Sequence, residues 1–194
     1  MPIMAMTACS TKPEREPSSL AESMKPASAH DELQQGSQGV PKSLTFNAPK
    51  DWIAEAPSSS MRKAQYRLPR AEGDPEDAEM AVFYFSGGGG AVQANIDRWT
   101  SQFENPAGGS IASAARTTHK VVHGIPLTIV DISGTYNVPS MGSMMASANK
   151  KENFRMLAVM AEAGDGPWFF KLTGPSRTVA KWEESFQSFL DTIR

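Results

Sequence analysis

Residues 154–173, FRMLAVMAEAGDGPWFFKLT, contain two apolar runs on either side of a short break. The runs 154–163 and 168–173 are rich in the aliphatic and aromatic side chains that strands favour. The break, Gly164 to Pro167, consists of residues that form turns. Because strands joined by so short a connection pair in antiparallel fashion, this stretch predicts a β-hairpin.

Similar strand patterns occur on the N-terminal side of this hairpin. Residues 63–68 and 79–85 are expected to be two strands separated by an acidic loop, and residues 116–123 and 127–136 two more. A polar, Met-rich loop is expected from Val138 to about Lys151. Strands that follow one another across short connections indicate a largely antiparallel sheet.

Two segments have helical periodicity instead. The apolar residues Val92, Ile96, Trp99 and Phe103 are spaced by four, three and four positions, which predicts one buried face. A C-terminal helix is expected after Pro175, with Ser176 as its N-cap. Its apolar stripe consists of Val179, Trp182, Phe186, Phe189, Leu190 and Ile193.

The predicted element order is β-β-β-α-β-β-β-β-α, in which the first strand precedes residue 63. It indicates the α+β class, with an antiparallel β-sheet flanked by two amphipathic helices. A repeating βαβ series is absent from the predicted order, which disfavours a parallel nucleotide-binding sheet.

Composition narrows the classes of function. The 194 residues carry a formal net charge of -2, so no basic excess favours nucleic acid as a partner. No apolar run in the sequence approaches the roughly 18 to 20 residues that span a bilayer. Cys9 is the single cysteine, which excludes an intramolecular disulfide and disfavours a cysteine-based zinc site.

The first residues suggest a localisation. Met6-Thr7-Ala8-Cys9 resembles a lipobox, the signal at which bacterial lipoproteins are cleaved and lipidated on cysteine. A polar stretch from Cys9 to about Val40 is too poor in apolar residues to fold, so we expect a tether.

The domain expectation is a residual signal peptide at 1–8, a disordered tether at 9–42 and one folded domain at 43–194. Only eight residues precede Cys9 and none is basic, so we expect Met1 to lie inside a longer signal peptide. The expected location is the cell envelope, lipid-anchored on the periplasmic side of the inner or outer membrane. The alternative is a cytoplasmic protein with a polar tail and an isolated cysteine.

Short motifs carry a family resemblance. The segment 46–52, FNAPKDW, resembles the opening of PsbP-like domains, which include photosystem-associated lumenal proteins and the Mog family. The segments 60–62 (SMR), 95–99 (NIDRW) and 168–175 (WFFKLTGP) are similar to a family of uncharacterised bacterial lipoproteins. The resemblance covers most of 43–194 and implies an α/β/α sandwich that binds or assembles with other molecules. It supplies no catalytic residues.

Two sets of side chains are candidate metal ligands. His119 and His123 are four apart on a predicted strand and would share a face, with Asp131 on the next strand within reach. The thioethers of the predicted loop suit copper(I); they belong to Met141, Met144 and Met145. The alternatives are an exposed sheet face for the histidines and a pliable loop for the methionines.

No pattern typical of catalysis is present: the sequence has no Gly-x-Ser-x-Gly, and its domain has no cysteine nucleophile. Arg62 and Arg98 are candidate contacts for an anionic partner. The sequence therefore favours a non-enzymatic envelope lipoprotein that acts as a binding or assembly module, without a cofactor. Its expected partners are a membrane, through the lipid anchor, and an unidentified protein. The alternative is an envelope protein that binds copper or zinc.

Overall fold

The computed structural model describes residues 44–86, 88–138 and 149–194. Its strands are β1 (Ile53–Glu55), β2 (Arg62–Leu68), β3 (Ala78–Tyr84), β4 (Phe103–Glu104), β5 (Arg116–Val122), β6 (Ile125–Val138), β7 (Asn149–Ala163) and β8 (Gly166–Pro175). Its helices are α1 (Val92–Thr100), the short 3-10 helix η1 (Ile111–Ser113) and α2 (Ser176–Leu190).

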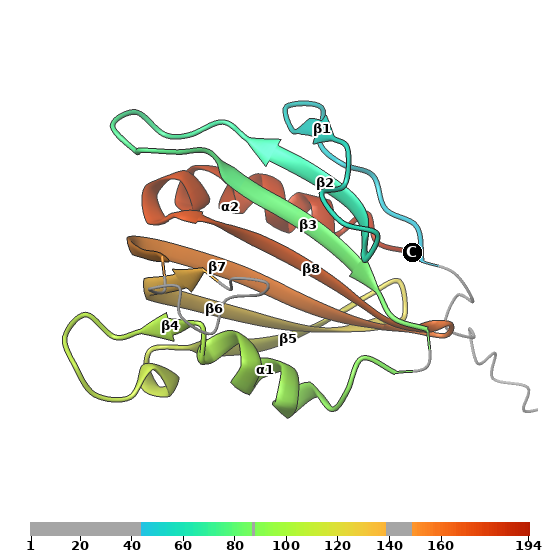
Figure 1. The fold of residues 1–194 in the computed structure, drawn as a ribbon. Helices are drawn as coiled ribbons and strands as arrows, with labels where there is room; N and C mark the ends of the chain where they lie inside the picture. Colours follow the sequence, from blue (N-terminus) through green and yellow to red (C-terminus); the bar gives the residue numbers. More distant parts are fainter. Residues whose placement is uncertain (1–43, 87, 139–148) are drawn as a thin grey trace, which may run out of the picture. The chain divides into compact units, whose positions relative to one another are not determined.

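All eight strands form one antiparallel sheet in the order β1-β2-β3-β8-β7-β6-β4, and β5 also pairs with β6 (Figure 1). The hairpin expected at 154–173 is the centre of this sheet, because β7 and β8 are paired from Phe154–Pro175 to Ala163–Gly166. The α+β class with an antiparallel sheet and two helices is confirmed. Within the described residues, β4 and the short helix η1 are the elements that the predicted order lacked.

Helix α2 packs on one face of the sheet, across β7 and β8. The predicted stripe supplies this contact, because Val179, Phe186 and Phe189 are completely buried. Leu172 and Phe170 of β8 and Val159 of β7 are among the sheet residues beneath it. These residues stand at alternate positions of their strands, because successive side chains of a strand point to opposite faces.

Helix α1 packs on the opposite face. Trp99 is buried there in a cluster with Met160 and Phe169, and its ring meets the Phe169 ring edge-on at 6.0 Å. The helix ends at Thr100, so the prediction that Phe103 belongs to its stripe is wrong. Phe103 begins β4 and pairs with Tyr136 of β6, which still buries its side chain in the same cluster.

The N-terminus of α2 differs from the expectation. Ser176 is the first helical residue, and the N-cap position is Pro175, whose side chain cannot accept a hydrogen bond. The acceptor is Asp74, in the loop between β2 and β3: its Oδ2 accepts from the Thr178 backbone N at 2.8 Å and from the Thr178 hydroxyl at 2.6 Å. The Arg177 Nε lies 3.0 Å from the other Asp74 oxygen. A carboxylate from a distant loop therefore satisfies the helix end.

Asp74→Ala should lower the melting temperature by about 3 °C, whereas Ser176→Ala should change it much less. The Thr178 hydroxyl, followed by the Arg177 guanidinium, holds the pKa of Asp74 below its ordinary value. Its stabilisation is therefore present above the ordinary pKa of about 4 and is lost as pH falls through the lowered value. Thermal unfolding monitored by circular dichroism at several pH values measures both effects. A larger loss in Ser176→Ala than in Asp74→Ala would contradict this assignment of the cap.

Candidate functional site

The two helices cover their faces of the sheet unequally. Helix α2 has 15 residues and α1 has nine, so they are roughly 22 Å and 14 Å long. Figure 1 shows α1 beside the β5 and β6 side of the sheet. On that face, no helix among the described residues covers β2 and β3. The side chains exposed there are mostly polar, as water contact requires.

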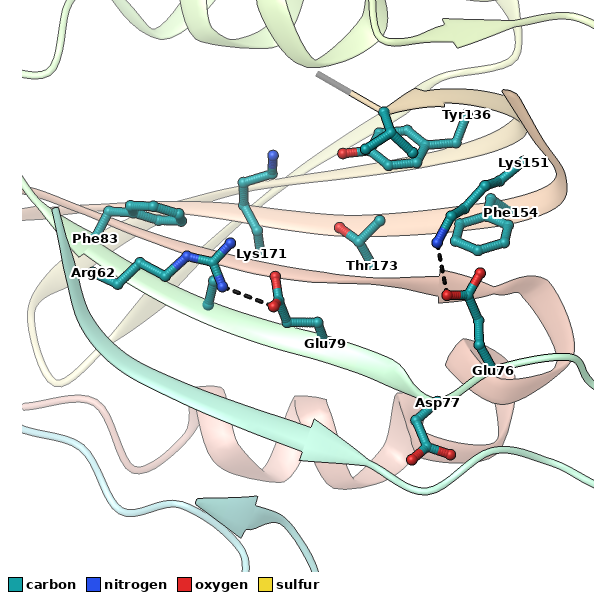
Figure 2. A pocket seen from close by; sticks show the side chains of 12 residues that line it. Arg62, Glu76, Asp77, Glu79, Phe83, Tyr136, Lys151, Phe154, Lys171 and Thr173 are labelled. Carbon is teal, nitrogen blue, oxygen red and sulfur yellow. Dashed lines mark hydrogen bonds and ion pairs between the residues drawn. The ribbon is translucent and has the colours of Figure 1, made fainter. Parts of the chain in front are cut away.

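A cavity of about 410 Å³ opens on this face (Figure 2). Side chains from β2, β3, β6, β7 and β8 line it. The described lining consists of Arg62, Glu76, Asp77, Glu79, Ala81, Phe83, Tyr136, Val138, Lys151, Phe154, Lys171 and Thr173. We call it the Lys171 pocket.

The register of the central strands explains the hollow. Lys171 of β8 stands opposite Ala81 of β3 on one side and Ala158 of β7 on the other. Directly opposed residues in an antiparallel sheet have their side chains on the same face. Since both neighbours end at Cβ, the lysine rises between two small side chains.

Two ion pairs occupy the rim of the pocket. Arg62 Nη1 lies 2.8 Å from Glu79 Oε2, and Lys151 Nζ lies 2.7 Å from Glu76 Oε2 (Figure 2). The cations also contact aromatic faces: the Arg62 guanidinium lies 5.7 Å from the Phe83 ring centroid, and the Lys151 ammonium 5.2 Å from that of Phe154. These four charges therefore neutralise one another in pairs.

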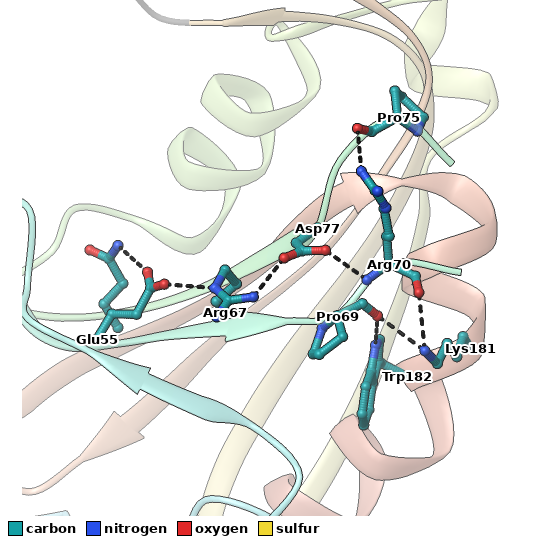
Figure 3. Close-up of polar contacts among 9 residues, drawn as sticks. Glu55, Arg67, Pro69, Arg70, Pro75, Asp77, Lys181 and Trp182 are labelled. Carbon is teal, nitrogen blue, oxygen red and sulfur yellow. Dashed lines mark hydrogen bonds and ion pairs between the residues drawn. The ribbon is translucent and has the colours of Figure 1, made fainter. Parts of the chain in front are cut away.

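Asp77 belongs to a different network, shown in Figure 3. Its Oδ2 lies 2.8 Å from Arg67 Nη1, and its Oδ1 accepts from the Arg70 backbone N at 2.9 Å. Arg67 also binds Glu55 at 2.9 Å, which links β1 to the loop after β2. The Arg67 side chain, followed by the Arg70 backbone, holds the pKa of Asp77 below its ordinary value. This carboxylate is therefore ionised and already paired.

Trp182 of α2 fixes the same loop from the other face of the sheet. Its indole Nε1 donates to the Pro69 carbonyl at 2.8 Å, and Lys181 Nζ donates to the carbonyls of Pro69 and Arg70 (Figure 3). The loop that carries Asp77 and Glu76 is thus attached to α2. Its position at the pocket rim follows from these bonds.

Lys171 is the exception among the charged residues of the pocket. No carboxylate oxygen of the described residues lies within 4.0 Å of its Nζ. Its one hydrogen bond within that part of the chain goes to Gln102 Oε1, at 3.5 Å. An ammonium has three N–H donors, and a buried donor without an acceptor is unfavourable.

The surroundings change the acidity of Lys171. Burial is the main cause that lowers its pKa from 10.5 to about 8, and the positive charges of Arg98 and Arg62 lower it further. Glu79 acts in the opposite direction, but it is paired with Arg62.

Tyr136, on the pocket wall, has a raised pKa because of burial and, secondarily, Glu79. Its phenol therefore stays protonated at neutral pH and can donate a hydrogen bond.

A second charged cluster, on the α2 face, contains a cation that is fully paired, unlike Lys171. Arg155 of β7 binds both oxygens of Asp131 on β6, at 2.8 and 2.9 Å, and those of Glu183 on α2, at 2.7 and 3.0 Å. Its hydrogen bond to Asp131 is the first cause of its raised pKa. Here a half-buried cation has two carboxylates, so the cluster fastens α2 to the sheet and leaves no charge for a ligand.

The structure separates the two histidines that the sequence suggested as a pair. His119 lies on β5 and contacts the Thr128 hydroxyl at 3.2 Å, on the α1 face of the sheet. His123 is not on the strand: it has φ 48° in the turn after β5, and its ring contacts the Ile193 carbonyl beyond α2, at 2.9 Å. Asp131 is three positions from Thr128 and therefore points to the α2 face, where Arg155 binds it.

The described residues contain no group of three or more His, Cys, Asp or Glu that could hold a metal ion. Cys9, Met141, Met144 and Met145 lie outside the described residues. Lipidation and copper binding by these residues stay predictions.

The two arginines suggested as partner contacts both lie near Lys171. Arg62 lines the pocket. Arg98 on α1 is exposed, and its Nη2 donates a hydrogen bond to Asn95 Oδ1 at 2.5 Å. Lys171 itself was missed by the sequence interpretation. The signal was a lysine between Phe170 and Leu172 in a strand otherwise apolar from 168 to 172, but the sequence alone does not show which strands flank it.

Comparisons with known proteins find similarity in structure but not in sequence. No protein-family model matches the chain, and no curated protein matches it. One similar solved structure is the cyanobacterial PsbP (CyanoP) of Synechocystis, with a TM-score of 0.43 and 12% identity over 82% of this chain and 95% of that chain. Another is a protein of unknown function from Pseudomonas aeruginosa, with a TM-score of 0.46 and 11% identity over 77% of this chain and 94% of that one.

In the described part of the chain, neither helix is long and apolar enough to cross a membrane.

Lys171→Met should stabilise the protein at neutral pH by about 1 to 3 kcal/mol, because it removes a half-buried charge that has one long hydrogen bond within the described residues. The pKa of Lys171 is lowered on folding, so the penalty is full below about pH 8 and disappears as pH rises toward 10.5. The advantage of Lys171→Met should therefore shrink over that range. Urea unfolding at a series of pH values measures this change in stability.

Lys50→Met, at an exposed lysine, is the control and should change stability little. A destabilised Lys171→Met at neutral pH would show that the charge is well satisfied.

Proposed function

We propose that this protein is a non-enzymatic binding module of the bacterial cell envelope, and that the Lys171 pocket is its recognition site. The observation that carries the proposal is the enclosed Lys171 ammonium, which has no carboxylate partner among the described residues. A ligand that presents negative charge would supply the missing partner. The cavity, at about 410 Å³, also lies within the usual size range of small-ligand sites.

The pairing of the other charges favours recognition over catalysis. Arg62 with Glu79 and Lys151 with Glu76 hold each other at hydrogen-bond distance. A carboxylate or amine held in an ion pair is poorly prepared to transfer a proton to a substrate, because the transfer would break the pair. The pocket therefore presents one available cation in a fixed frame of paired charges.

The envelope location is proposed from the sequence at Cys9. A lipid on this cysteine would hold the protein at a membrane, and the polar stretch up to residue 42 would act as the tether. A protein partner at the membrane is part of the same proposal. The metal-binding alternative gains no support from the geometry of His119 and His123.

Pocket binding is tested by thermal shift of the full chain carrying Cys9→Ser, against a panel of small carboxylates, phosphates, sulfonates, amines and neutral sugars. We expect at least one class of anion to raise the melting temperature, because a ligand that binds only the folded state stabilises it. Thr173→Phe, which fills part of the pocket from β8, should abolish the shift. The matched control is Thr118→Phe at an exposed position of β5, which should preserve it. If no compound gives a shift that Thr173→Phe removes, the proposed site is wrong.

Lipidation is tested by labelling with a radioactive fatty acid in a bacterial host, with the gene and its upstream DNA. The protein with Cys9 should incorporate label and partition with membranes, and Cys9→Ser should do neither, because the thiol is the acceptor. Absence of label from both proteins would remove the envelope location and leave the pocket unaffected.

A further inference from the structure

A count of charges around the Lys171 pocket limits what can bind there. Three cations line it, namely Arg62, Lys151 and Lys171, and Arg67 braces its rim. Arg62 is paired with Glu79, Lys151 with Glu76, and Arg67 with both Asp77 and Glu55. Among the cations that line the pocket, Lys171 alone has no counterion within the described residues. Arg98 lies near Lys171 and has no carboxylate partner there either, but it is exposed on α1 and does not line the pocket. A single negative charge on the ligand would complete the set.

The positions of the carboxylates disfavour a second negative charge. Glu79 and Glu76 lie along one side of the pocket, as Figure 2 shows, and each already has its cation. A dianion centred on Lys171 would bring its second charge toward these carboxylates, and no other described residue of the lining is an unpaired cation that could receive it. Like charges at short range in a half-buried site repel strongly.

Three further residues of the wall are aromatic, and two of them, Phe83 and Phe154, also contact the Arg62 and Lys151 cations. Tyr136 and Phe154 lie parallel with their ring centroids 6.0 Å apart, and Phe83 lies across the pocket from them (Figure 2). Such a wall favours an apolar, ring-sized body next to the charged group. The hydroxyls of Tyr136 and Thr173 add polar groups that can donate to an oxygen anion.

We propose that the ligand of the Lys171 pocket is a small organic monocarboxylate with an aromatic or similarly compact apolar body. Its carboxylate contacts the Lys171 ammonium, and its body lies against Tyr136, Phe154 and Phe83. This inference rests on the proposed function, since it names the chemistry of the ligand at the same site.

The probe is hydrocinnamate, and its matched analogues are hydrocinnamamide, which is neutral, and benzylmalonate, which carries a second carboxylate on the same skeleton. Binding to the full chain with Cys9→Ser is measured by isothermal titration calorimetry. Hydrocinnamate should bind with a dissociation constant of about 1 mM or below. The amide and the dicarboxylate should each bind at least about tenfold more weakly.

The pH dependence identifies the cation. Lys171 faces Arg62 on β2, Glu79 on β3, Arg98 on α1 and Tyr136 on β6, and its own pKa in the free protein is about 8. Hydrocinnamate binds the protonated lysine, so its affinity should be constant near neutral pH and about tenfold lower one unit above that pKa. Lys171→Met should abolish binding. In Lys171→Arg, whose charge does not titrate in this range, the affinity should not fall as pH rises.

Each outcome has a separate meaning. Binding of hydrocinnamate that is lost in Lys171→Met and becomes independent of pH in Lys171→Arg supports the inference. If benzylmalonate or hydrocinnamamide binds as tightly, or if Lys171→Met binds normally, the monocarboxylate assignment is wrong. If hydrocinnamate fails while another class from the thermal-shift panel gives a shift that Thr173→Phe removes, this inference falls and the proposed function stands. Failure of the whole panel removes both.

Discussion

A sheet needs a covering layer on each face where its side chains are apolar, and the two helices of this domain provide unequal layers. Helix α2 lies across the centre of one face and buries an apolar stripe there. The nine residues of α1 cover only the β6 side of the other face. The side chains of β2 and β3 on that face must therefore be compatible with water, and most of them are charged or polar. Leu68, Met80 and Val82 of these strands are in the core on the α2 face. The Lys171 pocket exists because no helix of the described residues covers their opposite face.

The position of Lys171 makes this pocket different from an ordinary charged surface. The residue lies on β8, which is bonded to β3 on one side and β7 on the other, so its backbone is held at the centre of the sheet. Its neighbours Ala81 and Ala158 leave space above them, and the other cations that line the pocket, Arg62 and Lys151, are already paired. A rigid frame and one unsatisfied charge are the properties of a preorganised site, because little rearrangement is needed when the ligand arrives.

Local sequence patterns predicted the parts of the fold that depend on local physics. The hairpin of β7 and β8 and the stripe of α2 follow from strand alternation and helical periodicity, and both are present. Two of the misses come from contact between residues far apart in the chain. Asp74 caps α2 in place of Ser176 from a loop about 100 residues away, and the charged frame around Lys171 comes from β2, β3, β7 and the loop before β3. A single sequence contains no local signal for such pairings. The error at His123 is local: His123 and Gly124 form the two-residue turn between β5 and β6, and both have a positive φ.

The energetics of Lys171 connect the fold to the proposed role in binding. A lysine at the centre of a sheet, between two phenylalanines and a leucine in its own strand, is less favourable for folding than a methionine of similar length. Arg155 shows that this fold can satisfy a half-buried cation fully, with carboxylates from β6 and α2. Lys171 has no such arrangement within the described residues, although Glu79 is near enough to influence its pKa and is bound to Arg62 instead. Local departures from favourable packing and pairing occur mainly where a protein functions, because the missing interaction is then supplied by the ligand. The same unsatisfied ammonium that lowers the stability of the free protein therefore provides the free energy by which a bound anion would be held.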